Sequence, residues 1–315
     1  MNVREQLLAL NDELRRLKAE GRRTVVVSEE SLADLRMVLA DESAEAERAA
    51  PTVGAAAEPP AAPVRAFAAA PAALAPVAPV APPKPALPVR AEIVLPEGDK
   101  ATRWNALREL VLNDATCKSH VYPGKRVVFG VGSLDAAVMF VGEAPGGDEE
   151  EQGEPFVGRA GQLLNRMIKA MGVDRSQVYI GNILNWRPEM GTRNADGSQT
   201  GNRPPTAEEM NYCLPFIRAQ IAIIQPKVIV ALGKTAVDGL LGFERFKSMG
   251  AARGAWHEYA GTPLRATYHP SYLLRQEGLV SAAAKKIKRD AWEDLLAVME
   301  RAGLPISEKQ RNYFL

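Results

Sequence analysis

The sequence predicts an α/β fold with three layers, α/β/α, around a central and mainly four-stranded parallel sheet. Four short apolar runs alternate along residues 96–315 with longer segments whose apolar residues recur at helical spacing. Polar side chains suited to chemistry lie at or just after the ends of three of these runs. Alternation of strands and helices is typical of a parallel sheet that helices cover on both faces.

The expected strands are the apolar runs Ala137–Val141, Val178–Leu184, Val228–Leu232 and Leu264–Tyr268. The expected helices lie between and after them, at Ala160–Met171, Thr206–Ile224, Lys234–Leu241 and about Ser281–Arg301. A shorter apolar run at Arg126–Phe129 predicts an edge strand or a hairpin ahead of the first strand.

Composition divides the chain into an N-terminal helical module at 1–45, a linker at 46–95 and a globular domain at 96–315. Residues 51–90 are mostly alanine and proline and carry little charge. Such a tract lacks the apolar bulk to offset its ordering entropy, so we expect a disordered linker. The remaining domain is long enough to bury a substantial core.

The N-terminal module is predicted from an apolar stripe that alternates steps of four and three, formed by Val3, Leu7, Leu10, Leu14 and Leu17. This is the spacing of a coiled-coil seam. A second helix is expected to begin near Ser31. Two interpretations remain open: a module for weak self-association or for docking a protein partner, or a helical hairpin whose two stripes bury each other.

Charge and cysteine content exclude several classes of protein. The formal net charge is +1, so the whole-molecule field does not by itself indicate a polyanion partner. The charged residues at Met1–Glu5 do not fit a signal peptide, and no apolar run approaches membrane-spanning length. Cys117 and Cys213 are the two cysteines, which argues for a reducing compartment. We therefore expect a cytoplasmic protein without membrane association.

Three polar side chains are expected to converge at one edge of the sheet. Glu143 follows the first strand, Asn182 lies on or just past the second, and His269 follows the fourth. Ligands of open α/β sheets bind outside the carboxyl ends of the strands. Glu143 and Phe156 share one loop rich in glycine and proline, so the sequence predicts a site with a carboxylate and an aromatic ring.

Two further segments, at 272–275 and 233–235, each have more than one interpretation. Tyr272, Leu273 and Leu274 predict either a helix start that packs into the core or, beside Arg275, an apolar wedge for a DNA stack. The segment 233–235, Gly-Lys-Thr, looks like the end of a phosphate-binding loop. That loop requires a glycine where Val228 stands, so we predict an ordinary turn from strand to helix.

Together these segments resemble the uracil-DNA glycosylase superfamily, and its family 4 enzymes above all. The resemblance rests on Gly142-Glu143-Ala144-Pro145-Gly146 with Glu149, on Pro155-Phe156-Val157-Gly158-Arg159-Ala160-Gly161, on Asn182, and on His269-Pro270-Ser271-Tyr272-Leu273-Leu274. It covers about residues 104–300. It implies a monofunctional DNA repair hydrolase that flips uracil out of DNA, hydrolyses its N-glycosidic bond and leaves an abasic site.

The resemblance also implies the roles of the site residues. Glu143 would stabilise the sugar cation and orient water, while His269 and the Ala144 N–H would donate to uracil O2. Phe156 would stack on the base, and Asn182 would read its edge. Glu149 would form part of the pocket wall. The wedge that fills the gap left by the base would consist of Tyr272, Leu273, Leu274 and Arg275. Arg187 would contact a phosphate.

One departure from the family concerns its cofactor. Family 4 enzymes typically bind a 4Fe–4S cluster through four cysteines, of which Cys117 and Cys213 remain here. Trp186 occupies the place of another, and its indole nitrogen offers no lone pair to a metal. Since a cluster needs four thiolates, we predict no cofactor and an apolar packing role for Trp186. A zinc site from Cys117, His120 and Cys213 is the alternative.

A different class of function also remains open. The domain could be a non-catalytic module that binds uracil or abasic sites in DNA and recruits a partner through residues 1–45. The combination of Glu143, Asn182 and His269 favours the enzyme, because a binding module does not need a carboxylate that activates water.

Overall fold

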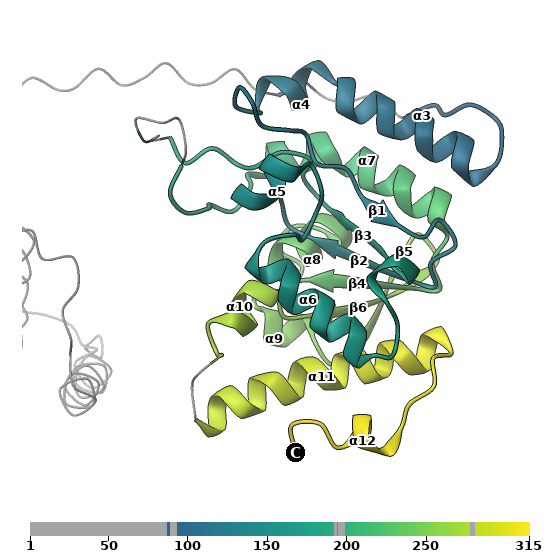
Figure 1. Cartoon of the computed structure of the whole chain (residues 1–315), viewed down its shortest axis with the longest axis vertical. Coiled ribbons are helices and arrows are strands. Elements are labelled where there is room, and N and C mark those ends of the chain that lie inside the picture. The colour runs from purple at the N-terminus through teal and green to yellow at the C-terminus, as the bar shows by residue number, and fades with distance from the viewer. Residues whose placement is uncertain (1–86, 89–92, 192–193, 195–198, 278–280) are drawn as a thin grey trace, which may run out of the picture. The chain divides into compact units, whose positions relative to one another are not determined.

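The computed structural model describes residues 87–88, 93–191, 194, 199–277 and 281–315 (Figure 1). The predicted N-terminal module at 1–45 and most of the predicted linker at 46–95 lie outside the described residues. Within the described ranges, no helix combines the length and the apolar character that crossing a membrane would need.

A sheet of six strands forms the centre of the described part of the chain, in the order β1-β3-β2-β4-β6-β5 (Figure 1). Neighbours among β3, β2, β4 and β6 are parallel, and β1 and β5 pair antiparallel at the two edges. The bounds in chain order are β1 Val131–Gly132, β2 Val138–Gly142, β3 Tyr179–Asn182, β4 Val228–Leu232, β5 Trp256–Tyr259 and β6 Thr262–Thr267. This arrangement confirms the predicted α/β fold with four central parallel strands.

The edge strands are where the prediction from sequence was wrong. The apolar run Arg126–Phe129 is not a strand, because Arg126 N–H donates to Glu150 O and Val128 N–H donates to Asn185 O in neighbouring loops. Only the next residues, Val131 and Gly132, reach β3. The strand β5 was not predicted, since its residues are exposed or half-buried and form no apolar run.

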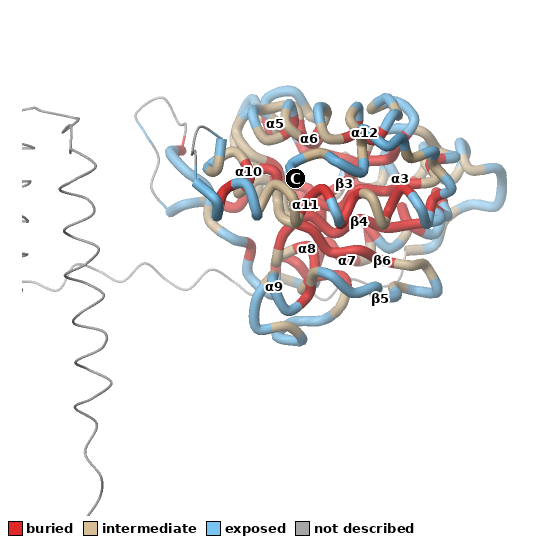
Figure 2. Tube along the Cα trace, turned by 90° about the horizontal axis from the view of Figure 1, so that it is seen from below, coloured by how far each residue is buried: buried red, intermediate tan, exposed pale blue. Residues whose placement is uncertain are grey.

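Two layers of helices cover the sheet, because successive residues of a strand face opposite sides. Met139 and Val141 of β2 pack with α3 (Lys100–Asn113), α7 (Ala207–Ile224) and α8 (Lys234–Leu241). Val138 and Phe140 pack on the other side with α6 (Arg159–Ala170) and α11 (Ala282–Ala302). Figure 2 shows the buried residues gathered along the sheet between these layers.

Short helices connect these elements: α4 (Ala115–Ser119), α5 (Gly147–Gln152), the 3₁₀ turn Arg175–Gln177, α9 (Met249–Ala252), α10 (Pro270–Leu274) and α12 (Glu308–Arg311). The long predicted helices are confirmed within one or two residues. Their starts follow local chemistry, since Thr206 forms a capping box with Glu209 and the Ser281 hydroxyl caps α11.

Trp186 belongs to the core on the α3 and α7 side of the sheet. Its side chain is 1% exposed and stacks on His120, with ring centroids 4.6 Å apart. The ring of Tyr212, on α7, also lies near the indole, with ring centroids 6.1 Å apart. The buried thiols of Cys117 and Cys213 lie within hydrogen-bonding reach of each other in the same core cluster. The indole therefore has the apolar packing role predicted for it.

We expect Trp186→Ala to lower the free energy of unfolding by about 3–5 kcal/mol, because truncation leaves a cavity in a close-packed core. Trp186→Phe should cost less than half as much. It keeps a ring against His120, and it removes an indole Nε1–H that lacks a hydrogen-bond partner in the described structure. Chemical denaturation followed by circular dichroism measures both variants, and equal losses would contradict the packing role.

Candidate active site

A cavity of about 580 Å³ opens at the carboxyl ends of the parallel strands. This is the edge at which an open α/β sheet binds its ligands. Most of the predicted site residues line it together: Glu143, Ala144, Glu149, Phe156, Asn182, His269, Tyr272 and Arg275. Segments up to 132 residues apart in sequence, from Glu143 to Arg275, thus meet in one place, as the sheet topology requires.

Gly142 sets how closely two of these side chains approach each other. The residue is the last of β2, and the parallel register places it opposite Asn182 at the end of β3. A Cβ atom on Gly142 would lie 2.5 Å from Asn182 Oδ1 and 2.5 Å from the Phe156 ring. Both distances are too short for any side chain, so glycine is required for the amide and the ring to share this space.

The loop that carries Phe156 is strained and held from two sides. Phe156 has a φ of 54°, in the left-handed region that bulky residues rarely adopt. The Glu149 carboxylate accepts hydrogen bonds of 3.0 Å from the backbone N–H groups of Gly146, Val157 and Gly158. The Arg175 guanidinium donates to the carbonyls of Phe156 and Pro155. These contacts hold the ring in place before any ligand arrives.

Glu149 lines the cavity, and its carboxylate also spans the loop, where it accepts the three backbone hydrogen bonds described above. The sequence contained a signal for this role, because Glu149 stands at the third position of α5, where a carboxylate bonds back to the N-cap backbone. Nothing in the sequence indicated that Arg175 holds this loop, because its backbone partners, Phe156 and Pro155, lie 19 and 20 residues away in the chain.

Asn182 presents an unpaired hydrogen-bond acceptor at the cavity. Its side chain is 6% exposed, and Oδ1 is buried without a partner among the described residues. Leaving a buried amide oxygen unpaired costs free energy, so such atoms are rare unless a ligand or water completes them. The Asn182 oxygen thus offers an acceptor to a hydrogen-bond donor that enters the cavity.

His269 is held as a neutral hydrogen-bond donor. It caps α10, and its Nδ1 accepts a hydrogen bond of 3.2 Å from the backbone N–H of Ser271. Nδ1 also lies 2.7 Å from the Ser271 hydroxyl, which can donate as well as accept. Since the backbone N–H can only donate, these contacts favour the neutral tautomer that carries its proton on Nε2. Burial and the nearby Arg275 lower the pKa of His269 to about 4. The ring is therefore uncharged at neutral pH.

Glu143 lies at the same edge, half-buried between β2 and α8. Burial raises the pKa of its carboxyl group. The hydroxyl of Thr235 donates to Glu143 Oε2 at 2.5 Å, which lowers the pKa and offsets part of that effect. The sequence did not indicate Thr235 as a site residue, because its Gly-Lys-Thr segment predicts an ordinary turn from strand to helix.

A family model described as the uracil DNA glycosylase superfamily matches residues 129–296, which span the sheet and this cavity. The chain belongs to the uracil-DNA glycosylase superfamily. Among its relatives is a type-4 uracil-DNA glycosylase of Thermotoga maritima, 40% identical over 170 residues, or 54% of this chain and 79% of the relative. A type-4 enzyme of Pyrobaculum aerophilum is 38% identical over 179 residues, or 55% and 85%. A type-5 enzyme of the same organism is 31% identical over 184 residues, or 51% and 73%.

The cluster-binding residues of family 4 glycosylases are incomplete in this member of the superfamily. Two thiols and an indole do not supply the four thiolates that a 4Fe–4S cluster needs. The hydrogen bond with Cys213 and burial raise the pKa of the Cys117 thiol, which favours the protonated form over the thiolate that binds metals. Within the described ranges, no three His, Cys, Asp or Glu side chains are grouped to hold a metal ion, so the zinc alternative does not fit.

Two residues expected at the DNA surface of this glycosylase fold have other partners. Leu273 is 6% exposed and lines an apolar cavity with Trp292 and Leu295 of α11, which fits the alternative of a helix start that packs into the core. The wedge role of Leu273 stays a prediction. In a helix, consecutive residues face different directions, and Tyr272 and Arg275 line the active-site cavity instead. Leu274 is half-buried.

Arg187 is the second residue that was expected at the DNA surface and that has partners within the protein. Its guanidinium forms a nearly buried ion pair of 2.9 Å with Glu150 and donates to Asn202 Oδ1 and to the carbonyls of Gln199 and Gly201. These bonds tie the loop after β3 to α5 and occupy the guanidinium within the protein. The expected contact of Arg187 with a DNA phosphate stays a prediction.

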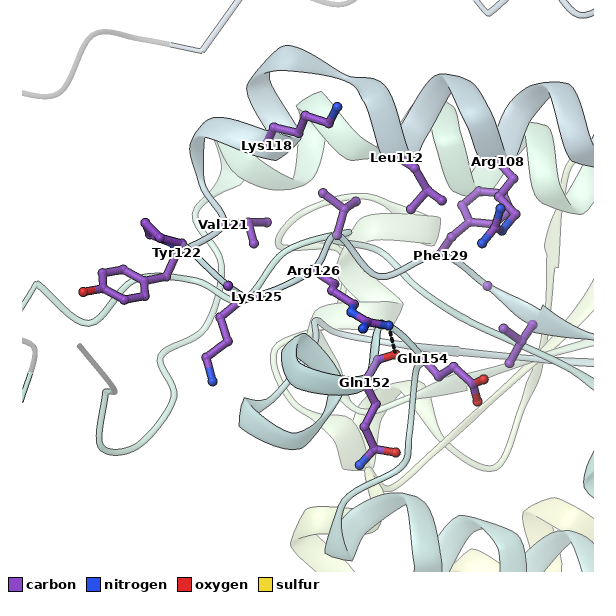
Figure 3. A pocket seen from close by; sticks show the side chains of 16 residues that line it. Arg108, Leu112, Lys118, Val121, Tyr122, Lys125, Arg126, Phe129, Gln152 and Glu154 are labelled. Carbon is purple, nitrogen blue, oxygen red and sulfur yellow. Dashed lines mark hydrogen bonds between the residues drawn. The ribbon is translucent and has the colours of Figure 1, made fainter. Parts of the chain in front are cut away.

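A second cavity of similar size, about 600 Å³, lies between α3 and the end of α5, where Leu112 and Gln152 are among its lining residues (Figure 3). Basic side chains, among them Arg108, Lys118 and Arg126, surround it, and Arg126 donates to the Gln152 carbonyl. None of the predicted catalytic side chains lines this cavity. The two cavities therefore differ little in volume. They differ in the carboxylate, amide and imidazole groups of the predicted site, which gather only at the first of the two.

We expect His269 to remain neutral down to a pH near 4, with its proton on Nε2. A titration of the three histidines followed by ¹⁵N-edited NMR measures this directly. Ser271→Ala keeps the backbone donor and serves as the control, so the tautomer should not change. A His269 pKa near the ordinary value of about 6.5 would contradict the buried, neutral ring.

Proposed function

We propose that this protein is a DNA repair glycosylase that flips uracil out of DNA, hydrolyses its N-glycosidic bond and leaves an abasic site. The observation that carries the proposal is the unpaired Asn182 Oδ1 beside the Phe156 ring, in a cavity that also holds Glu143 and His269. The relatives described above are uracil-DNA glycosylases by name, which supports the same activity.

The amide of Asn182 accounts for the choice of base. Its buried oxygen would accept from uracil N3–H, and its NH₂ group would donate to O4. Cytosine has an acceptor at position 3 and a donor at position 4, so both contacts would become mismatches. A site that leaves buried polar groups unpaired rejects the wrong substrate by large factors. The flat face of Phe156 would support either pyrimidine without reading its edge.

The neutral His269 ring accounts for departure of the base. As the bond from C1′ to N1 breaks, its electron pair passes to the uracil ring, and negative charge gathers on O2. The Nε2–H of His269 is a donor that would meet this charge, with the Ala144 N–H as a second donor. A donor aimed at developing charge commonly contributes about 3–4 kcal/mol to lowering a barrier.

Glu143 would act on the sugar side of the same bond. Its carboxylate would stabilise the positive charge that develops at C1′ and accept a proton from the attacking water. The water oxygen then forms the new bond to C1′, and the uracil anion leaves and takes a proton from solvent. Burial strengthens this charge interaction, because fewer water molecules screen it.

Uracil in a duplex is stacked, so the nucleotide must rotate out of the helix to reach this cavity. Tyr272 and Arg275 lie at the cavity wall, where they would contact the DNA around the displaced base.

We further propose that the enzyme works in the cytoplasm. Residues 1–45, tethered by the linker at 46–95, would serve weak self-association or a protein partner.

We expect Glu143→Gln and His269→Ala each to slow uracil release by at least about a hundredfold, because each removes charge stabilisation from the transition state. The assay is single-turnover excision from a labelled oligonucleotide, read after alkaline cleavage of abasic sites. Thermal unfolding of both variants should stay close to that of the original protein. Near-original rates in both variants would refute the assigned roles.

The same assay separates the enzyme from a non-catalytic module that binds uracil or abasic sites. Such a module would retain uracil-containing DNA in a binding measurement but produce no alkali-labile strand at any enzyme concentration. Absence of abasic product with the original protein would therefore refute the glycosylase.

We expect Asn182→Asp to reduce the preference for uracil over cytosine rather than the overall fold. A carboxylate can no longer donate to uracil O4, and one lost contact to a buried polar group changes selectivity by about ten- to a hundredfold. The ratio of kcat/KM for uracil and cytosine substrates measures the effect. An unchanged ratio would show that the amide does not read the base.

A further inference from the structure

The turn that follows β4 contacts both proposed catalytic side chains. Gly233, Lys234 and Thr235 form this turn and the start of α8, and all three line the active-site cavity. Gly233 has a φ of 88°, and a Cβ atom there would lie 2.9 Å from His269 Cβ. The glycine therefore lets the chain pass against the histidine, while Thr235 contacts the Glu143 carboxylate.

Thr235 makes the specific contact. Its Oγ1 donates to Glu143 Oε2 at 2.5 Å, a hydrogen bond between residues 92 positions apart. Bonds of this kind, from a hydroxyl to a carboxylate, are short and stronger than bonds between neutral groups. Lys234 does not share the role, because its Nζ pairs with Asp238 at 2.6 Å, one turn further along the same helix.

We propose that Thr235 is a positioning residue for Glu143, whose hydroxyl holds Oε2 of the carboxylate and so leaves Oε1 directed at the attacking water. This inference rests on the proposed glycosylase function and adds to it a residue from the segment that resembles a phosphate-binding loop. Thr235 acts through Glu143 and need not touch the DNA.

The hydroxyl also bears on the charge of the carboxylate. Burial raises the pKa of Glu143, and the bond from Thr235 lowers it. Without this donor the pKa of Glu143 would rise further, and the charged form would be lost at a higher pH. Since the charged form is the active one, the acid limb of the activity profile should move to higher pH when the hydroxyl is removed.

Thr235→Val removes the donor at nearly constant volume, and Thr235→Ser keeps it, so these two form a matched pair. With a uracil-containing oligonucleotide, we expect Thr235→Val to lower kcat about ten- to a hundredfold and to change KM little. Its acid limb should move to higher pH. Thr235→Ser should keep most of the activity and the original pH profile.

A double-mutant cycle tests whether Thr235 acts through Glu143. In a Glu143→Gln background the carboxylate is already absent, so adding Thr235→Val should reduce the residual rate by no more than about twofold. A full additional loss in that background would mean that Thr235 contacts the substrate directly, and would overturn the inference.

Two other results would also overturn it. A Thr235→Ser variant as inactive as Thr235→Val, with the same loss of thermal stability, would indicate a purely structural role. Full activity of Thr235→Val would show that the hydrogen bond is not needed, while the glycosylase function would stand. A lack of uracil release by the original protein would refute the proposed function itself, so the two failures remain distinct.

Discussion

The close approach of three groups at Gly142 is the constraint on which the site depends. Parallel pairing of β2 and β3 places the last residue of one strand opposite Asn182 of the other. Since Gly142 has no side chain, the Asn182 amide and the Phe156 ring can occupy the same small volume. The sheet register therefore brings together the pair of side chains that we propose to recognise the base, and the strained turn at Phe156 places its ring in that volume.

Burial acts in opposite ways on the two proposed catalytic groups. It lowers the pKa of His269, which keeps the ring a neutral donor suited to a departing anion. Burial also raises the pKa of Glu143, which disfavours the charged carboxylate that the proposed mechanism uses. The Thr235 hydroxyl offsets part of this second effect. The neutral donor and the carboxyl group thus line the same cavity under opposite effects of burial.

The core beside the site is packed with an indole, an imidazole and two thiols where a cluster would need four thiolates. Trp186 stacks on His120, and Cys117 and Cys213 are buried in the same cluster of apolar side chains. Ordinary packing therefore supports the loop after β3, together with the ion pair between Arg187 and Glu150.

The sequence by itself determined the four parallel strands and the convergence of Glu143, Asn182 and His269, because the residues that follow parallel strands must share one edge of the sheet. The spacing of apolar residues and the order of the elements along the chain can be read from the sequence alone. These two properties were enough to predict the strands and the convergence of the three side chains. Only the tertiary structure decided which side chains hold that site: the bond from Thr235, the clamp by Arg175, the loop-spanning Glu149 and the buried face of Leu273. Most of these depend on distances between segments far apart in the chain or on which way a short helix faces, and no local pattern specifies either.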